Sequence, residues 1–152
     1  MASITNLFTT TSILTLLEQQ ELSLDDKIIK FFDPNTLNGI HIYKGVDYSS
    51  ELTISNLLFQ TSGLPDVYLE GKDCMKNRII EEDFFITFSN TINMVKDLKP
   101  HFAPKEKEKS YYADINFDIL GKIIEKVSGL TLSEAYKNYI FEPLGLSNTY
   151  LP

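Results

Sequence analysis

The sequence is poor in the residues that build disulfides and metal sites. It has one cysteine, two histidines and no tryptophan among 152 residues. The single thiol, Cys74, excludes an intrachain disulfide, and without Cys or His neighbours it indicates a buried structural side chain rather than a metal ligand. His41 and His101 stand outside any ligand-spaced motif, so we expect ordinary core or surface histidines. We therefore predict no metal and no cofactor.

Positive charge and long apolar runs are also scarce. The net charge of −7 argues against nucleic-acid and anionic-membrane binding, because both need a basic face. No run approaches the roughly 18 apolar residues of a membrane span. Residues 1–6 lack the positive start of a secretory signal. We expect a soluble, cytoplasmic chain with no nucleic-acid or membrane partner, and a signal peptide encoded upstream would overturn that location.

What the sequence has in quantity is apolar spacing of helical period. The apolar fraction of 43% suits one globular domain. Residues 66–80 are polar and predict a loop, Ser23 is expected to cap a short helix ending near Phe31, and no hairpin is indicated. The apolar spacing and the capping signals predict a mainly α fold with helices over residues 3–20, 53–60, 82–96, 115–128 and 132–140.

The helix over residues 3–20 is apolar on most of its sides, which is typical of a buried helix. At the start of a chain such a helix has lost its cover. We therefore expect helices 3–20 and 115–128 to leave an apolar patch larger than a monomer usually exposes. Self-association or a complementing subunit would cover it.

Two stretches carry candidate chemistry. Ser3 stands at the start of the first helix, where free backbone N–H groups can hold an oxyanion, and Asn6 follows on the same helical face. Taken alone, a serine there is simply an N-cap. The second stretch places Tyr112 and Asp114 between a loop and the clearest helix. Taken alone, the tyrosine can simply pack and the aspartate can simply cap.

Six segments follow one another in an order that carries more information than any one of them. They are Ala2–Thr9, Leu22–Asp26, Ile54–Asp66 with Gln60-Thr61-Ser62-Gly63-Leu64-Pro65 at its heart, Tyr112-Ala113-Asp114, Ile123–Gly129 and Phe141–Leu146. Together they resemble the class C β-lactamase and D-alanyl-D-alanine carboxypeptidase family of serine hydrolases. The family patterns in question include Ser-x-x-Lys, His-Thr-Ser-Gly-Leu-Pro and Tyr-x-Asn.

The resemblance implies a single partial domain over residues 1–152, the helical portion of an α/β fold that lacks most of its antiparallel sheet. It implies acyl-enzyme chemistry on a small molecule or peptide: a β-lactam, a D-alanyl peptide or a small ester. Ser3 would be the nucleophile, Tyr112 the general base or acid, and Asp114 a polar partner for the substrate. Thr61 and Ser62 would shape the turn beneath the site.

The sequence departs from the family pattern twice. Asn6 occupies the lysine position, and a carboxamide can neither accept the proton of Ser3 nor lower the pKa of Tyr112 by its charge. The family's Lys/His-x-Gly strand does not occur before Pro152. We therefore expect a truncated hydrolase that is inactive as this chain. The alternatives are a pseudoenzyme whose helical domain binds a peptide or partner subunit, and a decayed reading frame.

Overall fold

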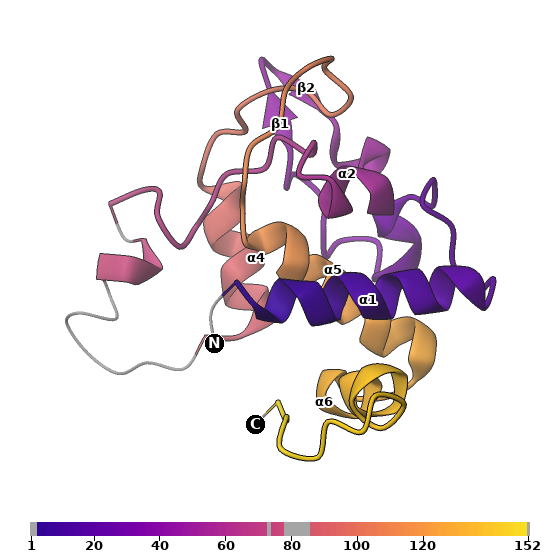
Figure 1. Ribbon diagram of the computed structural model, residues 1–152. Helices are drawn as coiled ribbons and strands as arrows, with labels where there is room; N and C mark the ends of the chain where they lie inside the picture. Colours follow the sequence, from indigo (N-terminus) through magenta and orange to yellow (C-terminus); the bar gives the residue numbers. More distant parts are fainter. Residues whose placement is uncertain (1–2, 73, 78–85, 152) are drawn as a thin grey trace.

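Helix α5, Ile115–Ser128, forms the centre of the fold in the computed structural model, which describes residues 3–72, 74–77 and 86–151. It contacts α1, α2 and α6, and Figure 1 shows these helices arranged around it. The helix ends at Gly129, whose φ of 71° is the left-handed conformation that glycine adopts without strain. The predicted bounds of this helix are confirmed. Five of its aliphatic side chains are fully buried: Ile115, Ile119, Leu120, Ile123 and Ile124.

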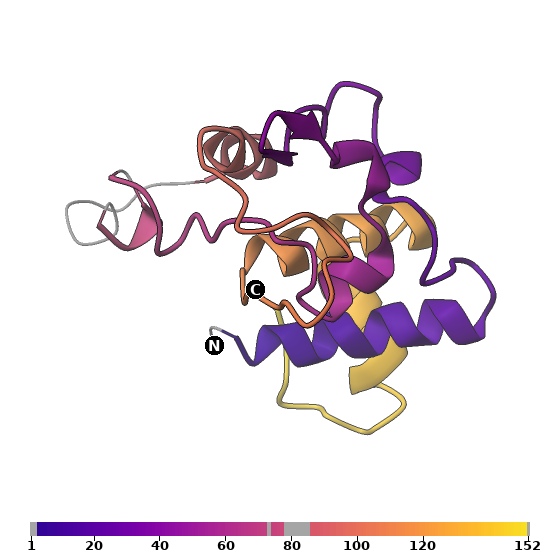
Figure 2. The ribbon, with the colours of Figure 1, turned by 90° about the horizontal axis from the view of Figure 1, so that it is seen from above.

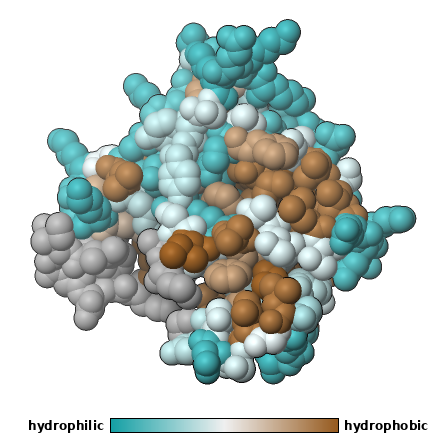
Figure 3. All heavy atoms as spheres, viewed as in Figure 1, coloured by the Kyte–Doolittle hydropathy of each residue, from teal (hydrophilic) through white to brown (hydrophobic). Residues whose placement is uncertain are grey.

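Helix α1, Thr5–Glu18, lies against α5 and against the C-terminal helices. In Figure 2 it runs along one side of the molecule. The side that faces the core buries Ile13 and Leu16, whereas Leu7 and Leu14 on the other side are exposed. The prediction of a helix buried on most sides is therefore wrong for half of its surface. Apolar side chains gather on the face that α1 crosses (Figure 3).

The remaining helices begin at threonine caps. Helices α2 (Ile54–Leu58), α4 (Phe88–Lys96) and α6 (Leu132–Tyr136) each follow a threonine. The threonine hydroxyl accepts the backbone N–H of the third helical residue, and the side chain of that residue accepts the backbone N–H of the threonine. These reciprocal bonds satisfy backbone N–H donors that have no partner within the helix. The capping box predicted at Thr131 is confirmed. Helix α4 begins at residue 88 rather than 82, and residues 82–85 of the prediction lie outside the described residues.

Short elements account for three corrections. The antiparallel hairpin β1 (Ile42–Tyr43) and β2 (Val46–Asp47) was not predicted. Lys44 and Gly45 between its strands both have positive φ, at 49° and 81°, as a tight hairpin turn requires. The predicted helix after Ser23 is a turn followed by a 3-10 helix, η1 (Ile28–Phe31). Residues 75–77 are helical within the predicted loop.

Short helical turns lie next to α2 and α6. The 3-10 turn η2 (Ser49–Glu51) precedes α2, and the π-helical turn η3 (Lys137–Phe141) extends α6, so the predicted helix over residues 132–140 is present in two parts. Among the described residues, β1 and β2 form the one sheet. The mainly α fold class is confirmed. None of the helices in the described ranges has the length and apolar character of a membrane span.

The cysteine and the two histidines take structural positions. Cys74 is buried and unpaired, as predicted. His41 is fully buried edge-on against Tyr48, and this burial lowers the pKa of the His41 imidazole. His101 lies nearer the surface, where its ring stacks on Tyr111 and its Nε2 lies 3.1 Å from the carboxylate of Glu70. Both histidines therefore fit the core or surface roles expected of them.

Candidate functional site

Ser3 lies at the entrance to α1 with its side chain free of any capping role. Its carbonyl oxygen accepts the N–H of Asn6 at 3.1 Å, which begins the helical turn. The N-cap position itself is Ile4, and no side chain caps the helix there. The N-cap interpretation of Ser3 is therefore wrong. Its hydroxyl oxygen is directed instead toward Tyr112, a residue 109 positions away in the sequence.

The phenol oxygen of Tyr112 joins the four predicted site residues into one cluster. Tyr112 Oη lies 3.0 Å from Ser3 Oγ and 2.6 Å from Asp114 Oδ1, and it accepts a hydrogen bond of 2.9 Å from Asn6 Nδ2. Asn6 Nδ2 also lies 3.4 Å from Asp114 Oδ1. The structure thus brings together Ser3, Asn6, Tyr112 and Asp114 from opposite ends of the chain.

The two simpler interpretations of the second stretch are also wrong. Tyr112 is 47% exposed, so its ring does not serve as core packing. Asp114 occupies the N-cap position of α5, but its side chain makes no capping hydrogen bond. Its carboxylate is committed to the phenol of Tyr112 and to Asn6. Both side chains are thus available to the site.

The pKa of Tyr112 is raised by its surroundings. Partial burial disfavours the charged phenolate, and the hydrogen bond to the carboxylate of Asp114 holds the phenol proton in place. Hydrogen bonds from Ser3 and Asn6 act in the opposite direction but are smaller. Tyr112 is therefore a protonated phenol near neutral pH. A phenolate that removes the proton of Ser3 unaided is not what this site contains.

Gln60 positions Tyr112, although it was not predicted from the sequence to be a site residue. Its backbone has a φ of 58°, its carbonyl oxygen accepts the N–H of Tyr111 at 2.9 Å, and its Oε1 accepts the N–H of Ala113 at 3.0 Å. These two bonds hold the backbone on either side of Tyr112. Gln60 Oε1 also accepts Nδ2 of the fully buried Asn116. The only sequence signal was its place at the head of the Gln-Thr-Ser-Gly segment.

The two residues after Gln60 have the structural roles that the resemblance implied. The hydroxyl of Ser62 is fully buried and donates to Asn116 Oδ1 at 2.8 Å. Thr61 Oγ1 accepts a longer bond of 3.4 Å from Asn56 Nδ2. Gln60 and Ser62 thus tie the turn after α2 to the first turn of α5, and Thr61 ties the same turn to α2.

Replacing Gln60 by alanine should destabilise the chain by about 1–3 kcal/mol, because a buried backbone N–H and a buried carboxamide lose their acceptor. Gln20→Ala is a matched control: Gln20 also has a positive φ, 59°, but its side chain is exposed. Urea unfolding of both variants measures the difference. Equal midpoints for the two variants would show that the bonds of Gln60 contribute nothing.

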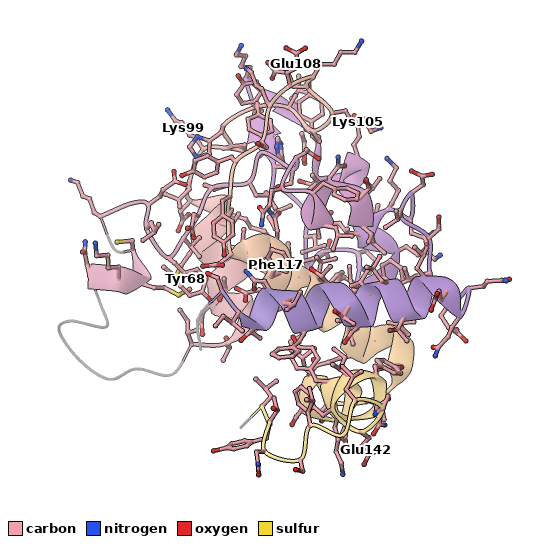
Figure 4. All side chains as sticks on the ribbon, viewed as in Figure 1. Tyr68, Lys99, Lys105, Glu108, Phe117 and Glu142 are labelled. Atoms are coloured by element: carbon pink, nitrogen blue, oxygen red, sulfur yellow. The ribbon has the colours of Figure 1, made fainter. Side chains whose placement is uncertain are left out.

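A pocket of about 490 Å³ opens beside the cluster, between α1, α4, α5 and α6. Asn6 and Asp114 line it, together with Tyr68, Phe117 and Asp118. Figure 4 shows Tyr68 and Phe117 near the N-terminal end of α1. A ligand held in this pocket would lie next to the reactive groups, as substrate pockets do.

One acid in the pocket wall is strongly perturbed. Burial, reinforced by the nearby charges of Asp114 and Asp66, raises the pKa of Asp118 to about 6. Tyr68 Oη donates to Asp118 Oδ2 at 3.1 Å and partly opposes that shift. Within the described ranges no group of His, Cys, Asp and Glu side chains is arranged to hold a metal ion.

The fold that positions this cluster is similar to that of known proteins. The chain is 27% identical to a D-stereospecific amidohydrolase from Streptomyces sp., whose structure superposes with a TM-score of 0.76 over 95% of this chain and 41% of that one. It is 29% identical to Protein flp of Staphylococcus aureus (strain NCTC 8325 / PS 47), covering 98% of this chain and 27% of that protein. It is 27% identical to a putative D-alanyl-D-alanine carboxypeptidase of Escherichia coli (strain K12), covering 98% and 32%.

The model of the family described as Beta-lactamase matches residues 1–152. The chain therefore belongs to the beta-lactamase family, as its motifs indicated. It spans about a third or less of the length of the curated relatives just described. The helical part of the family fold is what these residues form.

Proposed function

We propose that this chain carries the nucleophile of an acyl-serine hydrolase, with Ser3 as the attacking residue. The observation that supports this most is the 3.0 Å separation of Ser3 Oγ and Tyr112 Oη at the start of α1. The N-terminal end of a helix carries partial positive charge, which favours negative charge that develops beside it. The hydroxyl attacks an amide or ester carbonyl, an acyl-serine forms, and water then releases the acyl group.

The chemistry of a serine nucleophile and the names of the relatives support a proposal for the substrate class. A β-lactam, a D-alanyl peptide and a small ester all present the carbonyl that such a serine attacks. The amidohydrolase and the putative carboxypeptidase are named for D-configured substrates. We propose an amide or ester of a D-amino acid as the substrate that the pocket beside Asn6 and Asp114 accepts.

The 152 residues alone are proposed not to turn such a substrate over. Residue 6 is a carboxamide with no titratable nitrogen, so nothing at the lysine position takes up and returns protons through both half-reactions. Acylation is the easier half with an activated ester, because the nitrophenolate leaving group needs no proton. We therefore expect a single acylation event and slow release.

A 4-nitrophenyl ester should give a burst of at most one nitrophenolate per chain, with little turnover afterwards, and none in Ser3→Ala. Stopped-flow absorbance measures the burst. Asn6→Lys should not convert it to turnover, because the new ammonium would lie beside the carboxylate of Asp114, now 3.4 Å from Asn6 Nδ2, and stay protonated. The absence of a burst in the wild-type chain, or an unchanged burst in Ser3→Ala, would overturn the role of Ser3 as nucleophile. Sustained turnover would overturn the proposed inactivity.

A second candidate role, binding a partner, rests on the exposed side of α1. Leu7 and Leu14 on α1, and Ile4 just before it, are exposed, which supports the expected apolar patch there. For α5 the prediction is wrong, because its aliphatic face is fully buried among α1, α2 and α6. We propose that a second copy or a complementing polypeptide covers the exposed side of α1.

The chain should therefore bind a hydrophobic dye, and Leu7→Gln should reduce dye fluorescence. Leu69→Gln is the control, since Leu69 and Leu7 are both 64% exposed but Leu69 belongs to the segment after α2 and not to α1. Fluorescence titration and light scattering give the two readouts. A monodisperse chain that binds no dye would contradict the proposed binding role.

A further inference from the structure

We infer that Asp114 is a catalytic residue that takes the proton of Ser3 through the hydroxyl of Tyr112. This inference rests on the proposed role of Ser3 as nucleophile. It replaces the role of a substrate-binding residue that the motif alone implied for Asp114. For the acylation step alone, it also supplies the proton acceptor that residue 6 does not provide.

The hydrogen-bond inventory at Tyr112 determines which way each proton points. A phenol has one proton, and two acceptors lie within reach: Asp114 Oδ1 at 2.6 Å and Ser3 Oγ at 3.0 Å. A separation of 2.6 Å is typical of a hydroxyl that donates to a charged carboxylate, the stronger of the two kinds of bond. The phenol proton therefore belongs to the bond with Asp114.

The remaining bonds then fall into place. With its proton directed at Asp114, Tyr112 Oη has lone pairs for two donors. Asn6 Nδ2 donates to one at 2.9 Å. Ser3 Oγ lies 3.0 Å from Tyr112 Oη, placed as an acceptor of the phenol proton, and once that proton is committed to Asp114 the Ser3 hydroxyl turns to donate to the other lone pair. A continuous chain of O–H bonds thus runs from Ser3 through Tyr112 to Asp114. Asn6, which cannot accept the proton itself, orients the phenol that passes it on.

The proton transfer balances without any further reactant. As Ser3 Oγ bonds to the carbonyl carbon, its proton moves to Tyr112 Oη and the phenol proton moves to Asp114 Oδ1. The tetrahedral intermediate then collapses, the bond to the leaving group breaks, and the proton returns along the same path to that group. Tyr112 stays neutral throughout, which agrees with the raised pKa of its phenol.

Other acids near this path are less suited to the role. The groups whose charges act on or near Asp114 are Asp66, Tyr68 and Asp118. Asp118 accepts a hydrogen bond from Tyr68, and the carboxylate of Asp66 accepts the N–H of Tyr68. Asp114 is the acid that bonds to Tyr112 among the described residues.

The test measures how fast a fluorophosphonate labels Ser3 in the whole chain, followed by intact mass. In this reaction Ser3 Oγ bonds to phosphorus, fluoride leaves, and the proton passes to Asp114. Asp114→Asn keeps the shape and an acceptor for Tyr112 but removes the base. Labelling should slow roughly 100-fold, the lower end of what a positioned base contributes. Asp25→Asn, which removes an exposed charge, should label like the wild type.

A charge-swapped variant separates a proton acceptor from a merely structural residue. Asn6→Lys with Asp114→Asn moves the titratable group to the other side of the phenol. Its labelling should recover at least tenfold over Asp114→Asn and rise with pH between 7 and 10, because the amine must first lose its proton. Wild-type labelling should lack this rise, because residue 6 of the wild type carries no amine.

Each result bears on one of the two claims. If Asp114→Asn labels within threefold of the wild type, Asp114 is not the acceptor, while the role of Ser3 stands. If Ser3 of the wild-type chain is not labelled under conditions that label trypsin, the proposed function fails, and this inference fails with it. A charge-swapped variant that stays as slow as Asp114→Asn, with a native far-ultraviolet circular dichroism spectrum, would also overturn the proton-acceptor role.

Discussion

Gly63→Ala is expected to destabilise the chain by about 3 kcal/mol or more, a substantial part of the roughly 5–15 kcal/mol by which a typical domain is stable. Two effects add. The φ of Gly63 is +74°, a left-handed conformation that costs a residue with a Cβ about 1–2 kcal/mol. A Cβ there would also collide with the backbone carbonyl oxygen of Phe102. Backbone cannot rotate aside as a side chain can.

The collision would also separate two segments that hold the site. The N–H of His101 donates to the carbonyl of Gly63 at 2.8 Å, directly after the turn that carries Gln60. Gly45→Ala is the matched control, because Gly45 has a φ of 81° but no atom within 4 Å of the added Cβ. Urea unfolding should separate the variants by 2 kcal/mol or more. Equal destabilisation of the two variants would show that the contact with the Phe102 carbonyl oxygen does not contribute to the loss of stability.

Asp118→Asn is expected to stabilise the chain at neutral pH and to have little effect in acid. The folded pKa of Asp118, about 6, lies above its ordinary value of 3.8. Between these values the folded state binds more protons than the unfolded state, so stability contributed by this group falls as the pH rises from 4 to 6. Above pH 6 the penalty is complete, about 1–3 kcal/mol from a shift of about two units.

Unfolding midpoints in urea at pH 7.5 and pH 4 measure that difference. Asp25→Asn removes the same charge from an exposed position and corrects for the change in net charge. The gain of Asp118→Asn over this control should be present at pH 7.5 and absent at pH 4. A gain of equal size at both values would show that the carboxyl of Asp118 does not titrate near 6.

The parts of the fold predicted from sequence are those with local causes. Helix α5 was bounded correctly because an apolar stripe and a terminal glycine specify it. The start of α6 was predicted correctly because Thr131 and Glu134 form a capping box. The hairpin was missed because Lys44-Gly45 is not a recognised turn pair. The half-exposure of α1 was missed because a helix that is apolar all round does not show which side meets its neighbours.

The site divides in the same way. Ser3, Tyr112 and Asp114 were identified because motif order places them, and the structure brings them together with Asn6. The contact between Asp114 and Tyr112 could not be read from spacing, since it depends on how the chain turns into α5. The hydrogen bonds from Gln60 to the backbone around Tyr112 depend on packing between segments distant in sequence, so no local sequence pattern predicts them.

The location of a fluorophosphonate adduct tests the central claim, that Ser3 is the nucleophile, most directly. The chain is labelled, digested and mapped by tandem mass spectrometry, beside Ser3→Ala and Ser110→Ala. Ser110 is exposed and lies two residues before Tyr112. We expect one adduct, on Ser3, that is lost in Ser3→Ala and kept in Ser110→Ala. An adduct on Tyr112 or Ser110, or labelling that survives Ser3→Ala, would contradict this claim.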